Sequence, residues 1–112
     1  MAAGKYDIVI DQGSGFGLDL VVQESGSAKD LSSYSVRGQI RPTVTSDTLT
    51  ASFVGTVTEA SQGKINVALT PSTTAAMSAG KYFYDVEVHT SGDSVVTRLL
   101  QGTATVSPEV TR

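Results

Sequence analysis

His89 is the only histidine of the 112-residue chain, and two carboxylates lie close to it in sequence. Asp85, Glu87 and His89 are spaced i, i+2 and i+4, so in a strand all three point to the same side. The set could supply metal ligands, and His89 alone could act as a general base. Alternate side chains of a strand stand roughly 7 Å apart, which is wide for one small ion. We therefore expect a solvated polar strand face rather than a metal site.

The segment DQGSGFG at residues 11–17 raises the question of a phosphate-binding loop. A dinucleotide site needs G-x-G-x-x-G at the start of a helix, and here Leu18 stands in place of the third glycine. No Lys follows the glycines, as a GxxxxGK[ST] loop requires, and the next residues alternate like a strand. We therefore expect Gly13 and Gly15 to adopt positive φ in a connection between two strands.

Other reactive groups are missing or isolated. The chain has no cysteine, which excludes thiolate metal ligands, thiol nucleophiles and disulfides. No serine stands in a nucleophile-elbow motif, and there is no D-x-D-x-D-G calcium loop. We therefore predict that the chain is not an enzyme, that it has no catalytic residue, metal site or cofactor, and that no small molecule is its partner.

Charge and hydropathy argue against two further kinds of partner. The eight Lys and Arg residues stand singly along a chain of net charge −3, whereas nucleic-acid binding needs a concentrated positive surface. No apolar run approaches the roughly 20 residues that cross a bilayer. The start MAAGKYDIVIDQ meets acidic residues too soon for a signal peptide. We expect neither a nucleic acid nor a membrane as a partner.

Period-two alternation of apolar residues predicts seven strands. They cover residues 5–10, 16–23, 34–41, 49–57, 64–70, 81–89 and 95–106. The predicted inward side chains are Tyr6, Ile8, Ile10, Phe16, Leu18, Leu20, Val22, Tyr34, Val36, Ile40, Leu49, Ala51, Phe53, Val57, Ile65, Val67, Leu69, Tyr82, Tyr84, Val86, Val88, Val96, Leu100, Ala104 and Val106. The segments 59–64 and 90–94 are short enough to close hairpins.

The alternation is broken in the last predicted strand. Arg98 stands where an apolar residue is expected, while Leu99 is apolar where a polar residue is expected. An extra residue in the strand would restore the phase. We therefore predict a bulge near Leu99–Leu100, with Gly102 as a plausible companion.

One segment, TPSTTAAMSAGK, has the pattern of a short helix. Thr70 suits the N-cap and Pro71 the first helical position, while Gly80 suits a C-terminal stop. The helix is predicted over residues 71–78. We expect Ala75, Ala76 and Met77 to plug one end of the fold.

These elements predict an all-β fold. Serine and threonine make up about a quarter of the chain, and both favour strands or turns. The length suits one core, so we expect a single domain over residues 1–112, with short arms at its N- and C-terminal ends. Seven short strands at this spacing predict an immunoglobulin-like antiparallel β-sandwich with one short helix.

Four apolar residues fall on the strand faces opposite the predicted core: Val9, Val21, Val54 and Phe83. Apolar side chains on several outward faces indicate that other molecules cover those faces. We predict that these four residues belong to interfaces, with assembly into an oligomer or a larger particle.

Several phrases of the sequence resemble small immunoglobulin-like virion proteins of tailed bacteriophages, above all those of marine and cyanobacterial phages and of prophages. The opening strand ends in a Q-G step, and a D-L-[ST]-x-Y phrase and two longer blocks follow. The matching positions are Gln12 and Gly13, then Asp30, Leu31, Ser32 and Tyr34, then Leu69 through Val86, and finally Thr97 through Arg112.

The resemblance implies a non-enzymatic virion component that is assembled in the host cytoplasm. Its place would be the tail, the baseplate or the fibre-attachment region, or alternatively the head as a decoration protein. Its partners would be other virion proteins, in multiple symmetric copies. An alternative from another class is a module that binds carbohydrate or a cell surface through Tyr or Phe side chains together with Asp85 and Glu87.

Overall fold

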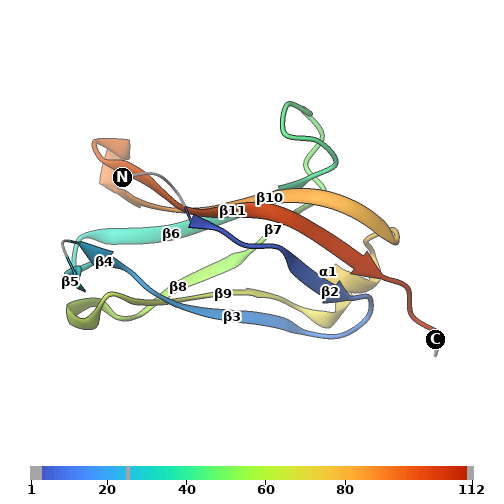
Figure 1. Ribbon diagram of the computed structural model, residues 1–112, viewed down its shortest axis with the longest axis horizontal. Coiled ribbons are helices and arrows are strands. Elements are labelled where there is room, and N and C mark those ends of the chain that lie inside the picture. Colours follow the sequence, from blue (N-terminus) through green and yellow to red (C-terminus); the bar gives the residue numbers. More distant parts are fainter. Residues whose placement is uncertain (1–3, 25, 111–112) are drawn as a thin grey trace.

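The computed structural model describes residues 4–24 and 26–110. Two β-sheets lie face to face and enclose the core (Figure 1). The strands are β1 (Gly4–Lys5), β2 (Ile8–Asp11), β3 (Phe16–Val21), β4 (Gln23–Glu24), β5 (Ser27–Ala28), β6 (Tyr34–Arg41), β7 (Ala51–Ser52), β8 (Val54–Glu59), β9 (Lys64–Leu69), β10 (Gly80–Thr90) and β11 (Val96–Ser107). The helical segments are η1 (Ala60–Gln62), α1 (Pro71–Ala75) and η2 (Ser91–Asp93).

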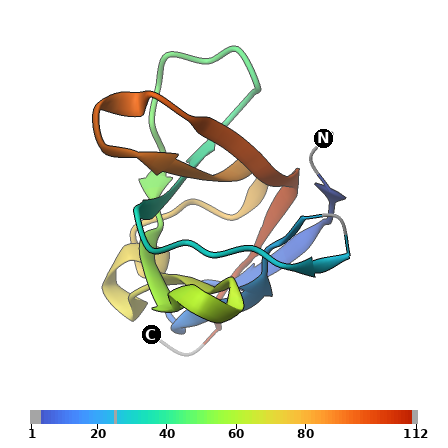
Figure 2. The ribbon, with the colours of Figure 1, turned by 90° about the vertical axis from the view of Figure 1, so that its left-hand side faces the viewer.

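The larger sheet has the order β1-β11-β10-β6-β7, with β2 also paired to β11, and the smaller sheet has the order β3-β9-β8. Figure 2 shows the two layers end-on. The orders β3-β9-β8 and β6-β10-β11 are those of immunoglobulin-type sandwiches. The prediction of an all-β, immunoglobulin-like sandwich is confirmed.

The sequence predicted an antiparallel sandwich, but two of the strand pairings are parallel. β1 and β2 run parallel to β11, so the N-terminal segment lies beside the C-terminal strand. A strand has the same apolar alternation in either direction, and so the sequence pattern carries no sign of this pairing. Of the predicted N-terminal arm, Gly4 and Lys5 form β1, while residues 1–3 lie outside the described residues.

The predicted strand over residues 49–57 is two strands in different sheets. β7 pairs with β6 in the larger sheet, and β8 pairs with β9 in the smaller one. Phe53 lies at the crossing point and is buried. The preceding loop, residues 42–50, rises from the larger sheet on the side away from the smaller sheet (Figures 1 and 2).

The core follows the predicted alternation closely. Its buried apolar residues are Ile8, Ile10, Val22, Leu31, Val36, Ile40, Ala51, Phe53, Ile65, Val67, Leu69, Met77, Tyr84, Val86, Val88, Ala104 and Val106. Three predicted members are instead about half exposed: Tyr6, Leu49 and Val96. Tyr6 lies between β1 and β2 at the edge of the larger sheet, Leu49 in the 42–50 loop, and Val96 at the hairpin end of β11.

The N-terminal segment is held against β11 by close backbone contact. The Tyr84 hydroxyl donates a hydrogen bond of 2.6 Å to the Tyr6 carbonyl, and the Thr103 amide donates one of 3.1 Å to the Asp7 carboxylate. Gly102 lies directly beneath the Tyr6 carbonyl and leaves no room for a side chain there. These contacts fix the N-terminal segment as the edge of the larger sheet.

Asp7 makes this attachment depend on pH. The hydrogen bonds from Thr103 hold the pKa of the Asp7 carboxyl below its ordinary value of 3.8, with a smaller contribution from Lys5. A lowered folded-state pKa gives stability that is present above pH 3.8 and lost as the pH falls through the folded-state pKa. We expect Asp7→Asn to melt below the wild type at pH 7, with a difference that shrinks at pH 3. A difference that stays constant in melting curves from pH 7 to pH 2 would contradict this role.

The predicted bulge in the last strand is confirmed. Val86 pairs with Leu100 and Glu87 pairs with Arg98, which leaves Leu99 as the extra residue of β11. Because the bulge shifts the phase of the strand, Leu99 and Leu100 both pack against the core. The bulge also places the Arg98 side chain on the outer face of the larger sheet.

The two predicted hairpins are also confirmed. β8 and β9 are joined through η1 and Gly63, which has φ 66°. β10 and β11 are joined through η2, where Gly92 has φ 73°. Glycine adopts these left-handed angles without the steric cost that a side chain brings.

The helix is shorter than the predicted 71–78. Thr70 caps α1 by accepting a 3.3 Å hydrogen bond from the Thr73 amide, as predicted. Thr74 and Met77 fill the end of the sandwich, whereas Ala75 and Ala76 are exposed, contrary to prediction. The Thr74 hydroxyl donates to the Ser14 carbonyl at 2.8 Å, which allows this polar side chain to be buried.

The corner between α1 and β10 is fixed by a tyrosine. The Tyr82 hydroxyl donates a hydrogen bond of 2.7 Å to the Ser78 carbonyl four residues upstream. A tyrosine near the start of this strand, bonded back to the upstream backbone, is a feature of immunoglobulin-type sandwiches. Among the described residues, no helix is long and apolar enough to span a membrane.

Candidate functional site

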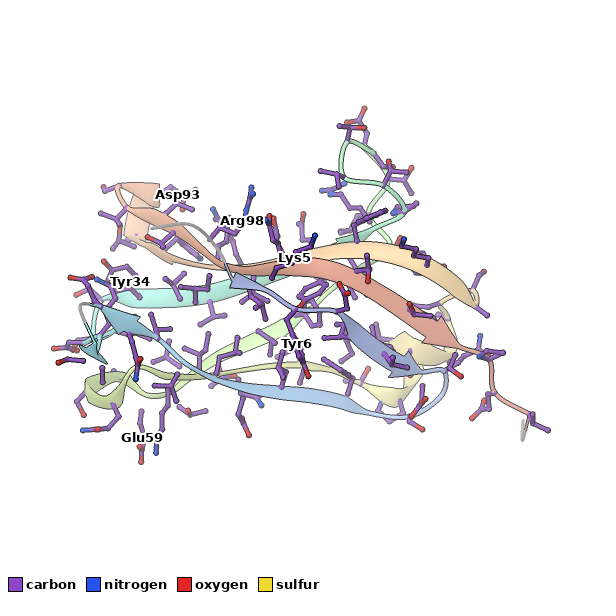
Figure 3. All side chains as sticks on the ribbon, in the orientation of Figure 1. Lys5, Tyr6, Tyr34, Glu59, Asp93 and Arg98 are labelled. Carbon is purple, nitrogen blue, oxygen red and sulfur yellow. The ribbon has the colours of Figure 1, made fainter. Side chains whose placement is uncertain are left out.

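The outer face of the larger sheet carries an open hollow of about 400 Å³. Strands β6, β10 and β11 form its floor, the 42–50 loop forms one wall, and β1 contributes Lys5. The side chains that give it chemical character are Lys5, Gln39, Arg41, Phe83, Asp85 and Arg98. Figure 3 shows Lys5 and Arg98 on the side of the sheet from which the loop rises. We call this feature the sheet-face hollow.

Strand register brings the floor residues together. Phe83 of β10 pairs with Arg41 on one side and Thr103 on the other, and Asp85 pairs with Gln39 and with Gln101. Cross-strand partners place their side chains on the same face, about 5 Å apart at Cβ. The floor is therefore two adjacent rows, one with an aromatic ring at its centre and one with a carboxylate.

Asp85 is the acidic centre of the sheet-face hollow. Burial raises the pKa of its carboxyl above the ordinary value of 3.8, Arg98 opposes that shift, and Glu87 adds to it. Arg98 Nε lies 3.4 Å from Asp85 Oδ2, and its Nη1 donates to Gln101 Oε1 at 3.2 Å. Asp85 is thus a half-buried acid with one cationic neighbour in contact.

Arg41 connects the floor of the sheet-face hollow to its loop wall through two hydrogen bonds. Its Nη2 donates a hydrogen bond of 2.8 Å to Gln39 Oε1, and its Nη1 donates one of 3.3 Å to the Ser46 carbonyl of the loop. The guanidinium is therefore held in a defined orientation between the sheet and the 42–50 loop.

The sequence grouped Asp85, Glu87 and His89, but the structure gives each a different partner. Glu87 pairs with the Arg37 guanidinium, and His89 Nδ1 lies 3.3 Å from an Asp93 carboxylate oxygen. Within residues 4–24 and 26–110, no three His, Cys, Asp or Glu side chains are placed to hold a metal ion. Of the three, Asp85 alone lines the sheet-face hollow.

The glycine-rich segment is a turn from β2 to β3. The Ser14 amide donates to the Asp11 carbonyl at 3.1 Å, and Gly13 has φ 84°, as a type II turn requires at that position. Positive φ was predicted for Gly13 and is confirmed, whereas the same prediction for Gly15 is wrong because the turn ends before it. Gln12 Oε1 accepts a hydrogen bond of 3.0 Å from the Glu109 amide, which holds the C-terminal segment next to this turn.

The four predicted interface residues do not gather into one patch. Val9 of β2 is 63% exposed, while Val21 and Val54, at 56% and 59%, lie on strands of the smaller sheet. Phe83 is only partly exposed and lines the sheet-face hollow. Their part in interfaces stays a prediction.

Sequence reasoning missed the cations that surround Phe83 and Asp85. The apolar alternation predicted that Arg41 lies on the polar face of the strand over residues 34–41, but it did not predict which strands pair with that strand. Lys5 and Arg98 reach the same hollow only through parallel pairing and the bulge at Leu99. The sequence signal that was available was the repeated Arg and Gln on outward positions of residues 34–41.

No family model and no curated protein matches this sequence. The structure is similar to the crystal structure of InlP from Listeria monocytogenes, with a TM-score of 0.51 and 20% sequence identity. The match covers 94% of this chain and 27% of that chain, so this chain spans about a quarter of the length of InlP. At this identity the likeness shows the fold alone, and it agrees with the β-sandwich described above.

Proposed function

We propose that the chain is a non-enzymatic docking module that works in multiple copies. The observation that carries the proposal is the outer face of the smaller sheet. Gly17, Ala68 and Val54 stand side by side across β3, β9 and β8, and Val21 lies on the same face beyond the hydrogen-bonded pair Asp19 and Asn66. The small side chains of Gly17 and Ala68 let another protein approach this strip closely, and burial of Val54 then stabilises the contact.

The setting that we propose is the virion of a tailed bacteriophage, in the tail, baseplate or fibre-attachment region. The resemblance of several phrases of the sequence to small immunoglobulin-like virion proteins supports it. Head decoration is the alternative place within the particle. Weak contacts at one copy become strong when they are repeated around a symmetric assembly. The partners are then other virion proteins.

Charge placed on this face tests the docking role. We expect Val54→Asp to fold normally but to be incorporated into purified phage particles at least about tenfold less than the wild type, because a buried carboxylate without a partner is costly. Val95→Asp is the matched control, since Val95 is exposed in the η2 hairpin, away from the face. Quantitative mass spectrometry of particles measures both. Equal incorporation of the two variants would contradict the proposal.

A second candidate function is recognition of a glycan at the sheet-face hollow. The observation in its favour is that Phe83 and Asp85 line one concave surface together with amide and hydroxyl side chains. Glu87 was expected to take part, but its ion pair with Arg37 keeps it outside that lining.

A further inference from the structure

The sheet-face hollow carries positive charge on a chain that is acidic as a whole. Lys5, Arg41 and Arg98 line it, against the single carboxylate of Asp85, while the net charge of the chain is −3. Among the described residues, no carboxylate lies within ion-pair distance of Lys5 or Arg41. The hollow therefore offers a local attraction for an anionic group on a chain whose net charge is negative.

The two guanidinium groups are already oriented. Arg41 is held by Gln39 and the Ser46 carbonyl, and Arg98 by Asp85 and Gln101. Each guanidinium has five N–H donors, and these contacts use only part of them. Donors that are fixed before binding lose little conformational entropy when a carboxylate arrives.

The other side chains that line the sheet-face hollow suit contacts with the hydroxyl groups and the carbon face of a sugar ring. Eight of the twelve lining residues carry hydrogen-bonding side chains directed away from the core, among them Gln39, Gln101 and Thr103. The ring of Phe83 supplies an apolar surface at the centre, with the Lys81 ammonium 5.7 Å from the ring centroid. Sugar hydroxyls match the amides and the Asp85 carboxylate, while the carbon side of a sugar ring matches Phe83. The volume of about 400 Å³ lies within the range of ligand sites.

We propose that the sheet-face hollow binds a carboxylate-bearing saccharide. Arg41 and Arg98 bind the sugar carboxylate, Lys5 adds attraction, Phe83 packs against the ring, and Asp85 accepts from hydroxyl groups. An acidic peptide is disfavoured because the floor strands β6, β10 and β11 are paired with neighbouring strands on both sides, which leaves little free strand edge for a peptide backbone. The inference rests on the second candidate function, glycan recognition.

Calorimetric titration of the full chain against a defined panel tests the inference. The panel holds tetragalacturonate, an oligomannuronate, a hyaluronan tetrasaccharide and sialyllactose, each beside its carboxyl-reduced form, with tetraglutamate as the peptide arm. We expect at least one acidic saccharide to bind at least about tenfold more tightly than its carboxyl-reduced form and than tetraglutamate. If neutral and acidic forms bind equally, glycan recognition stands and the acidic specificity is overturned. If no saccharide binds, both are overturned, and if tetraglutamate binds as tightly, the saccharide assignment is overturned.

Substitutions locate the site. Arg41→Gln and Arg98→Gln are each expected to weaken binding of the acidic saccharide about tenfold, because each removes charge-assisted hydrogen bonds. Lys64→Gln is the matched control, since it removes the same charge from the smaller sheet, where Lys64 pairs with Glu59. Melting curves of all three verify folding. Equal effects of the three substitutions would overturn the assignment to this hollow.

Discussion

Phe53→Ala is expected to lower the free energy of unfolding by about 3–5 kcal/mol. Phe53 lies where the chain leaves the larger sheet for the smaller one, and its ring packs 6.2 Å from that of Phe16 and 6.0 Å from that of Tyr84, between centroids. It also fills the space over Gly38, where no side chain is present. Truncation opens a cavity at the point where both sheets meet, and the backbone on each side is fixed by pairing, so the cavity cannot collapse.

Urea denaturation measures this loss, and Phe83→Ala is the matched control. The same atoms are removed there, but from a partly exposed ring on the outer face of the larger sheet. We expect the control to lose less than about half as much, because its ring leaves no sealed cavity. Similar losses for the two variants would mean that Phe53 is not a central core residue.

Gly102→Ala is expected to destabilise the chain by about 1–3 kcal/mol, a typical cost of overpacking. A Cβ at Gly102 would come within 3.0 Å of the Tyr6 carbonyl, and that carbonyl is part of the backbone that β11 and Tyr84 hold in place. The strain would push the N-terminal segment off β11. We therefore expect amide hydrogen exchange of residues 8–11 to become faster in the variant.

Gly17→Ala is the control for this substitution. Gly17 is also a strand glycine, but it has open space around the position of a Cβ. Its substitution should leave stability unchanged or slightly improved, since alanine loses less conformational entropy on folding. Protection of residues 8–11 that is unaffected by Gly102→Ala would contradict the role of Gly102.

The strand content of the fold was predictable because burial on one side of a sheet leaves a period of two in the sequence. Ile8 and Ile10, or Val86 and Val88, show it directly, and the bulge at Leu99 was visible as a break in that period. Pairing direction has no such signature, and so β2 was not recognised as parallel to β11. The switch of sheet at Phe53 was hidden for the same reason, since its neighbours alternate on both sides of the crossing.

The candidate site was less predictable than the fold. Phe83 and Asp85 were singled out on one strand, but the hollow depends on neighbours from β1, β6 and β11 that only register brings together. Arg98 reaches Asp85 because the bulge redirects its strand. The exposed faces were easier to predict, because Val21 and Val54 fall opposite core residues in any strand pairing.

We propose above that the folded sandwich works through the outer faces that it offers to other proteins. A cryo-electron microscopy reconstruction of the tailed-phage particle that we propose as the setting, with this chain located in the map, is the decisive measurement. We expect symmetric copies in which neighbouring proteins cover Val21 and Val54 on the smaller sheet. Absence of the chain from the particle, or copies whose outer faces both lie open to solvent, would contradict it.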